Sequence, residues 1–175
     1  MLFADCRDYT SLTRQLGVET ITPLINEFFR ASFQIVVDSD GIVDHFLGDA
    51  VMAFFNVPIQ HEDHAVRAVT AGTRILLAVP TINARVTGRE VLQVGIGIAS
   101  GWTYTSTVGT RSCHDYTVVG DTVNIASRLQ GEARPGELLV TQETYEVVKG
   151  AFPHAQRREC QLKGIPEPVI AYVLT

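Results

Sequence analysis

The sequence predicts an α+β fold of the ferredoxin-like type, with elements in the order βαββαβ and additional C-terminal strands and helices. Two observations support this prediction. Apolar residues recur at helical spacing in two segments, 18–37 and 65–76, and two short apolar strands joined by a Gly-Asp turn lie between them. Hydrophobic residues make up 46% of the 175 residues, which is enough for a substantial core. We therefore expect residues 1–175 to form a single domain.

The first half of the chain contains the central elements of this pattern. Residues 2–5 form a short apolar strand, which a polar turn over residues 6–10 follows. After the first long helix, strands over residues 42–47 and 50–55 flank Gly48 and Asp49. Gly at the first central position suits a two-residue type II′ turn, with Asp49 at the tip of the hairpin. The polar segment 61–64 then leads into the second helix.

The second half of the chain contains the additional elements. We predict that residues 91–98 and 103–108 are paired strands around Ser100 and Gly101. Residues 121–130 are predicted to form a helix, residues 137–140 a strand and residues 141–149 a further helix. Two more extended runs finish the chain.

Composition limits the classes of function. A net charge of −5 and a pI near 5.5 argue against a nucleic-acid-binding protein, which usually has a basic face. No apolar run approaches the roughly 20 residues that span a bilayer, and the N-terminus lacks the regions of a signal peptide. Cys6, Cys113 and Cys160 are odd in number and widely spaced, as in reducing, cytoplasmic proteins without disulfides. We expect a cytoplasmic catalytic module, either cut from a longer regulated protein or evolved without one.

Four polar residues indicate a chemistry. Asn124 and Arg128 are four residues apart on one predicted helical face, where an amide beside a guanidinium can orient a sugar next to phosphate. Asp5 and Asp49 each lie at the end of a short apolar strand, and carboxylate oxygens bind divalent ions. Asp also favours ordinary turns, and polar pairs also occur on solvated helices, so each pair alone leaves both interpretations open. Together they indicate metal-assisted chemistry on a nucleoside triphosphate.

Three segments carry a family resemblance. Residues 3–10 (FADCRDYT), 43–54 (VDHFLGDAVMAF) and 115–128 (DYTVVGDTVNIASR) resemble, in order and spacing, the motifs of class III nucleotidyl cyclase catalytic domains. The segment Leu162-Lys163-Gly164, with Pro166 and Pro168 after it, is similar to the end of such domains. The resemblance covers nearly the whole chain. It implies a phosphorus-oxygen lyase, an adenylate cyclase that makes 3′,5′-cyclic AMP and pyrophosphate from ATP.

The resemblance also implies catalytic roles. Asp5 and Asp49 would hold two Mg²⁺ or Mn²⁺ ions, which activate the ribose 3′-hydroxyl and clamp the phosphate oxygens. Asn124 would orient the ribose, Arg128 would stabilise charge on the α-phosphate, and Lys163 would meet the outgoing pyrophosphate. In this family the metal residues come from one subunit and the other three from its partner. A homodimer with shared active sites is therefore implied, and a monomer should be inactive.

The resemblance places the triphosphate at the turn after the first strand. Cys6, Asp8, Tyr9 and Thr10 would offer it backbone N–H groups. Asp8 stands where Gly is common in the family. A carboxylate there repels phosphate unless it points outward, for example towards Arg7.

His45 and Thr117 occupy the base-reading positions of the family. Many adenylyl cyclases have Lys and Asp there, and guanylyl cyclases have Glu and Cys. Thr at the second position resembles the bicarbonate-responsive adenylyl cyclases, which makes bicarbonate a candidate regulator. Neither side chain is the carboxylate that best accepts from guanine, so ATP is favoured. The alternatives are a weakly active or silent regulatory module of the same family, and a guanylyl or dual-specificity cyclase.

Overall fold

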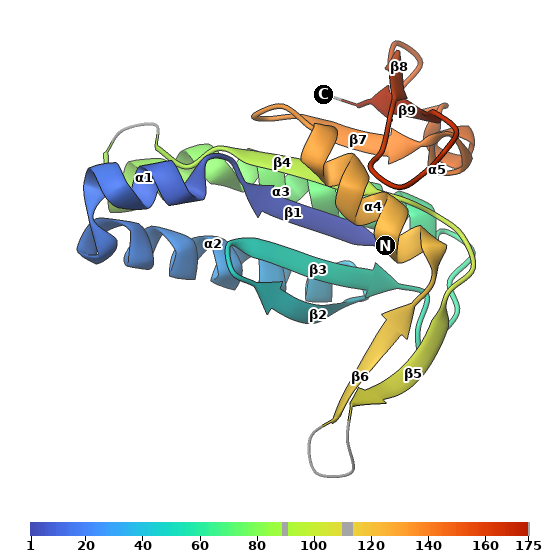
Figure 1. Cartoon of the computed structure of the whole chain (residues 1–175), viewed down its shortest axis with the longest axis horizontal. Helices are drawn as coiled ribbons and strands as arrows, with labels where there is room; N and C mark the ends of the chain where they lie inside the picture. The colour runs from blue at the N-terminus through green and yellow to red at the C-terminus, as the bar shows by residue number, and fades with distance from the viewer. Residues whose placement is uncertain (89–90, 110–113, 175) are drawn as a thin grey trace.

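The central feature of the fold is a mixed sheet of seven strands, in the order β2-β3-β1-β4-β7-β9-β8 (Figure 1). The computed structural model describes residues 1–88, 91–109 and 114–174. The strands are β1 (Leu2–Cys6), β2 (Gly41–Leu47), β3 (Ala50–Phe55), β4 (Val94–Ile98), β5 (Tyr104–Gly109), β6 (His114–Val119), β7 (Leu138–Thr141), β8 (Gln156–Cys160) and β9 (Val169–Val173). The helices are α1 (Tyr9–Leu16), α2 (Val18–Asp38), α3 (His64–Val86), α4 (Asp121–Glu132) and α5 (Gln142–Val148).

The ferredoxin-like prediction is confirmed in the order β2-β3-β1-β4. In this part of the sheet, β1 is central and antiparallel to both β3 and β4, and α2 and α3 make the two connections. The predicted C-terminal additions extend the same sheet. β7 pairs with β4 in parallel, and β9 and β8 follow as antiparallel strands.

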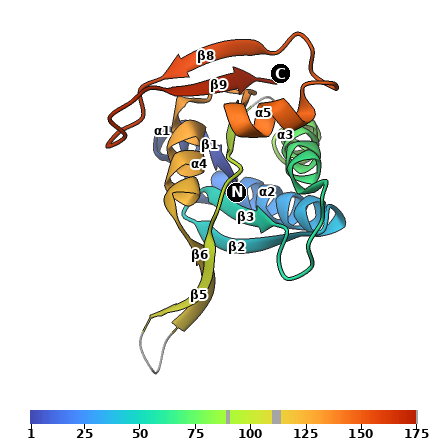
Figure 2. The same cartoon turned by 90° about the vertical axis from the view of Figure 1, so that its right-hand side faces the viewer.

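Helices cover both faces of the sheet. α2 and α3 lie on one face and α4 on the other (Figures 1 and 2). Successive side chains of a strand point to opposite faces, so Leu2, Ala4 and Cys6 join the core under α2 and α3, whereas Phe3 packs on the side of α4. By the same alternation, Asp5 belongs to the face that α4 covers.

α4 approaches the sheet closely at Gly97 of β4. A Cβ atom on Gly97 would stand 2.3 Å from the backbone nitrogen of Gln130 and 2.5 Å from the carbonyl oxygen of Ala126. No side chain fits at these distances, so glycine is required there. The missing side chain thus sets the height of α4, and with it the positions of Asn124 and Arg128.

The predicted pairing of residues 91–98 with residues 103–108 is wrong. β4 is already hydrogen-bonded on both edges, to β1 and to β7, so it offers no edge to β5. β5 instead pairs with β6, with Tyr104 opposite Val119. These two strands form an arm that projects from the body of the domain (Figures 1 and 2).

The region between β1 and α2 also differs from the prediction. The polar turn leads into a helix, α1, which the sequence analysis did not predict. Its apolar residues are only Tyr9, Leu12 and Leu16, too few to show a clear period. The two-residue hairpin turn is confirmed, because Leu47 pairs with Ala50 and Gly48 has a φ of 67°.

α3 runs to Val86 and is longer than predicted. Its 23 residues are apolar enough, by length and composition alone, to cross a membrane, which the sequence analysis did not expect of any segment. Ala68, Ile75 and Ile82 are buried in the core under the sheet. The core helix of a globular domain passes the same test, so this helix is weak evidence for a membrane span.

We expect Gly97→Ala to lower the free energy of unfolding by about 1–3 kcal/mol, because the new methyl group must push α4 away from the sheet. Gly131 lies in α4 itself, and no atom of a neighbouring element is within 4 Å of the position that its Cβ would occupy. Gly131→Ala should therefore raise the stability by up to about 1 kcal/mol, because Ala is the better helix former. Urea unfolding followed by circular dichroism measures both. Equal stability of the two variants would contradict the close approach.

Candidate active site

Asp5 and Asp49 lie close together at one end of the sheet. Asp5 pairs in register with Ala50, the neighbour of Asp49, and the backbone N–H of Cys6 donates to the carbonyl oxygen of Asp49 at 3.4 Å. Burial raises the pKa of Asp49, and the negative charge of Asp5 raises this pKa further. Two carboxylates that repel each other in a partly buried site are suited to binding a cation between them.

Arg7 connects this acidic pair to α4. Its guanidinium donates to a carboxylate oxygen of Asp5 at 2.7 Å, and to the backbone carbonyls of Gln130 and Ala133 at 3.4 and 3.3 Å. Arg7 therefore pairs with Asp5 rather than with Asp8. Arg7 and Asp5 are two residues apart in an extended segment and share a face, whereas Asp8 leaves the strand with a φ of 56°.

A hollow of about 450 Å³ opens beside Asp49 at the start of α1. It is lined by Cys6, Asp8, Tyr9, Thr10, Ser11, Arg14 and Asp49. The helix begins here without a side-chain hydrogen bond at its N-cap residue, Asp8. Such a helix start leaves backbone N–H groups available to an anion. The structure thus brings the four residues predicted for the triphosphate together with Asp49.

The lining of this hollow includes a residue that the sequence analysis missed. Arg14 lies in the last turn of α1, one helical turn after Thr10, and adds a positive charge to the hollow. Only a prediction of α1 itself could have found it. Burial, followed by the charges of Asp49 and Asp5, raises the pKa of the Cys6 thiol, so this buried cysteine stays protonated. Cys113 lies outside the described residues.

The two predicted base-reading residues, His45 and Thr117, both lie close to the side chain of Asp44. The hydroxyl of Thr117 donates to a carboxylate oxygen of Asp44 at 2.5 Å, and Nδ1 of His45 lies 3.1 Å from the same oxygen. The Asp44 side chain is only 3% exposed. The sequence analysis passed over this residue, although a carboxylate inside an otherwise apolar strand is a signal that could have found it.

The second polar pair lies on α4, and its Arg128 faces the loop that contains Gly164. Asn124 is exposed, and Arg128 is half-buried. The guanidinium of Arg128 is 3.6 Å from the position that a Cβ atom of Gly164 would occupy. Lys163, which precedes this glycine, is exposed. Arg128 and the loop that contains Lys163 therefore lie side by side, and both residues are predicted to act on the phosphates of the substrate.

The predicted residues fall into two groups that one chain does not join. The end of β1 and the β2–β3 turn, with Asp5 and Asp49, lie beside α1 at one end of the sheet (Figure 1). β6 and the start of α4, with Thr117 and Asn124, lie at the opposite end (Figure 1). Within one chain, Asp5 and Asp49 thus lie away from Thr117 and Asn124.

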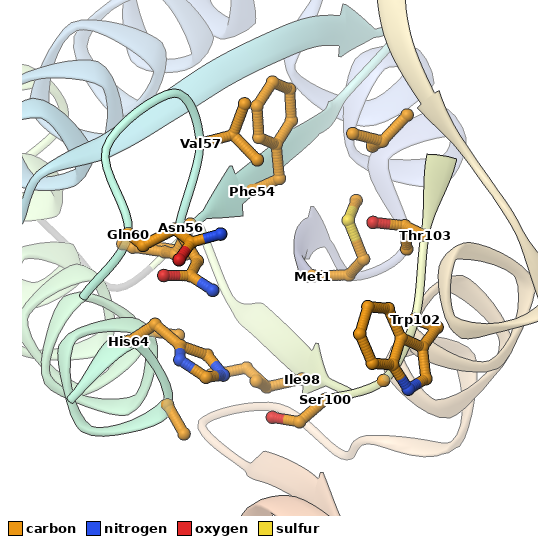
Figure 3. A pocket seen from close by; sticks show the side chains of 15 residues that line it. Met1, Phe54, Asn56, Val57, Gln60, His64, Ile98, Ser100, Trp102 and Thr103 are labelled. Carbon is orange, nitrogen blue, oxygen red and sulfur yellow. The ribbon is translucent and has the colours of Figure 1, made fainter. Parts of the chain in front are cut away.

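A second hollow, of about 230 Å³, contains none of the predicted site residues. Met1, Phe54, His64 and Trp102 are among the residues around it (Figure 3). Nδ1 of His64 lies 3.0 Å from the carbonyl oxygen of His61, so segment 61–64 leads into the helix as predicted. In the described ranges, no group of three His, Cys, Asp or Glu side chains could hold a metal. The pair Asp5 and Asp49 remains the candidate metal site.

Known proteins resemble the chain over its whole length. The profile of the adenylate and guanylate cyclase catalytic domain matches residues 1–175. The terminal-differentiation-specific adenylate cyclase of Dictyostelium discoideum is 31% identical over 151 residues, which cover 85% of this chain but 7% of that protein. The chain therefore spans only a small part of that relative's length.

Two solved structures share the fold. The adenylyl cyclase CyaB from P. aeruginosa superposes with a TM-score of 0.88 at 30% identity, over 99% of this chain and 91% of that chain. The guanylyl cyclase Cya2 superposes with a TM-score of 0.91 at 29% identity, over 99% of this chain and 89% of that chain. These matches confirm the predicted fold, and they include cyclases of both base specificities.

We expect Asp49→Asn to raise the melting temperature at neutral pH without divalent ions, because the amide removes a partly buried charge that faces Asp5. The folded-state pKa of Asp49 is raised, so its ionisation costs stability as the pH rises above the unfolded-state value of about 3.9. The advantage of the variant should disappear below about pH 4. Adding Mn²⁺ should raise the melting temperature of the parent but not that of Asp49→Asn. Differential scanning fluorimetry measures all three effects.

Asp63→Asn is the matched control for this experiment. The side-chain hydrogen bond from Arg67 lowers the pKa of Asp63, so the amide should not stabilise the protein at neutral pH. This variant should keep the response to Mn²⁺. An Asp49→Asn variant that gains as much from Mn²⁺ as the parent would rule out Asp49 as a metal ligand.

Proposed function

The chain belongs to the family of adenylate and guanylate cyclase catalytic domains, and from this premise we propose that it is a single catalytic domain that converts ATP to 3′,5′-cyclic AMP and pyrophosphate. The observation that carries the proposal is the pair Asp5 and Asp49 beside a helix start without a side-chain cap. Mutually repelling carboxylates suit a divalent cation, and free N–H groups suit the triphosphate that the cation accompanies.

Each group of residues has a part in the proposed reaction. Asp5 and Asp49 would hold two Mg²⁺ or Mn²⁺ ions, which supply activation of the ribose 3′-hydroxyl and neutralise phosphate charge. The N–H groups at the start of α1 bind the triphosphate. From the other subunit, Asn124 orients the ribose, Arg128 stabilises the charge on the α-phosphate, and Lys163 meets the leaving pyrophosphate.

We propose a cytoplasmic homodimer as the active form. The two residue groups lie at opposite ends of the sheet, so a two-fold arrangement of two chains would complete two equal sites. The β5–β6 arm and the segment before it expose large aromatic side chains. Trp102 is 95% exposed, Tyr104 80% and Tyr116 59%. Exposed apolar surface of this kind is typical of a protein interface. The free thiols of Cys6 and Cys160 support the cytoplasmic location.

ATP is the proposed substrate. Neither Thr117 nor His45 is a carboxylate, which is the group that best accepts hydrogen bonds from guanine. A guanylyl or dual-specificity cyclase is the second candidate, since Cya2 superposes as well as CyaB does. A silent regulatory module is less well supported, because it would need neither the acidic pair nor Asn124 and Arg128. Regulation by bicarbonate is part of the proposal on the strength of Thr117 alone.

We expect the purified protein to form cyclic AMP from ATP with Mn²⁺, and less cyclic GMP from GTP. Asp49→Ala should reduce turnover at least about a hundredfold, because a metal carboxylate is lost. Chromatographic quantification of both cyclic nucleotides measures this, and a bicarbonate titration in the same assay tests regulation. A preference for GTP would overturn the base assignment. If neither nucleotide gives a product, the silent regulatory module is the remaining interpretation.

Two inactive variants should restore activity when they are mixed. Asp49→Ala and Arg128→Ala each damage both sites of their own homodimer, but a mixed dimer keeps one intact site. We expect about a quarter of the parent activity from an equal mixture, because half of the dimers are mixed and each has one working site. Asp49→Ala mixed with Asp5→Ala is the matched control and should stay inactive. Equal recovery in both mixtures, or in neither, would contradict shared sites.

A further inference from the structure

Asp44 lies at a β-bulge in β2. The register with β3 shifts between Val43 and His45, so the ladder gives Asp44 no partner residue on β3. A bulge re-aims the side chains of its strand. Here it coincides with a carboxylate whose side chain is only 3% exposed. Such a buried carboxylate is costly unless neighbouring donors satisfy it.

Both predicted base-reading residues lie close to this carboxylate. The hydroxyl of Thr117, on β6, lies 2.5 Å from a carboxylate oxygen of Asp44, and Nδ1 of His45 lies 3.1 Å from the same oxygen. In the hydrogen bond between them, the Thr117 hydroxyl is the donor and the carboxylate oxygen of Asp44 is the acceptor. The single hydroxyl proton of Thr117 is thereby committed to Asp44.

This commitment changes what Thr117 can offer to a base. A free threonine hydroxyl both donates and accepts, so it serves an amino group and a carbonyl equally well. With its proton held by Asp44, the Thr117 oxygen can only accept. Adenine carries an amino group at ring position C6, whereas guanine carries a carbonyl oxygen there. An oxygen that can only accept matches the amino group of adenine and repels the carbonyl oxygen of guanine.

We propose that Asp44 is a positioning residue that determines base specificity, by making Thr117 an obligatory acceptor. This inference rests on the proposed function and deepens it. The selectivity for adenine then belongs to the pair of Thr117 and Asp44 rather than to threonine alone. A site built around one hydrogen-bond polarity rejects the opposite polarity, because the mismatched groups are left unpaired.

The test compares kcat/KM for ATP and for GTP. In Asp44→Asn, the amide can donate to Thr117 and release the hydroxyl proton towards a carbonyl group. We expect the ratio of kcat/KM for ATP to that for GTP to fall about tenfold. Thr117→Val should lower this ratio similarly, and Thr117→Ser, which keeps the hydroxyl, should preserve it. In the double variant Asp44→Asn/Thr117→Val the ratio should fall no further, because the two residues act as one unit.

Glu137→Gln is the matched control. This carboxylate is also largely enclosed, at 15% exposure, and it binds Arg158 at 2.7 Å on another part of the sheet. It should lose stability without any change in the ratio. A folded Asp44→Asn variant with the parental ratio, or additive losses in the double variant, would overturn the proposal. If Asp44→Asn does not fold, equal ratios in Thr117→Val and the parent overturn it.

Failure of this inference can be told apart from failure of the proposed function. If the parent forms neither cyclic nucleotide, the catalytic proposal fails. The ratio of the dissociation constants for ATP and GTP, measured by calorimetry on the same variants, then tests Asp44. We expect the dissociation constant for ATP divided by that for GTP to rise in Asp44→Asn and Thr117→Val, because the preference for adenine is lost, and to hold in Thr117→Ser. A ratio that is the same in all of them would overturn the role of Asp44.

Discussion

The close approach of α4 to the sheet at Gly97 is the constraint on which the rest of the site depends. Because β4 has no side chain there, the end of the helix lies low enough for the carbonyls of Gln130 and Ala133 to reach Arg7. Arg7 in turn holds Asp5. One backbone contact therefore determines the position of α4, the orientation of a metal-binding candidate and the link between them.

An electrostatic conflict suits the pair of Asp5 and Asp49 to the proposed metal binding. Burial and the charge of Asp5 both disfavour the ionised form of Asp49, and the guanidinium of Arg7 offsets only part of this cost. A divalent cation relieves the same conflict with a larger and more compact charge. The hollow beside Asp49, at the start of α1, suits an anion. The helix start presents N–H groups there, and Arg14 adds a positive charge.

Periodicity and turn chemistry were enough to predict the ferredoxin-like order, the hairpin with Asp49 at its tip and the helical face of Asn124 and Arg128. They could not predict α1, whose few apolar residues are too short a run to show a period. The pairing of β5 depends on which strand edges remain free, which is a property of the whole sheet. The same holds for the contact between Asp44 and Thr117, since local sequence does not show that β6 comes close to β2.

In the proposed site, different residues serve the reaction and the choice of base. Metal binding and phosphate stabilisation use full charges, which act over several ångströms and tolerate small changes in geometry. Adenine and guanine differ at ring position C6 mainly in the direction of a hydrogen bond, so a neutral hydroxyl that can rotate cannot separate them. Discrimination needs a fixed hydrogen-bond polarity, and a buried acceptor provides it without touching the base. Asp44 occupies that place between the two base-reading positions.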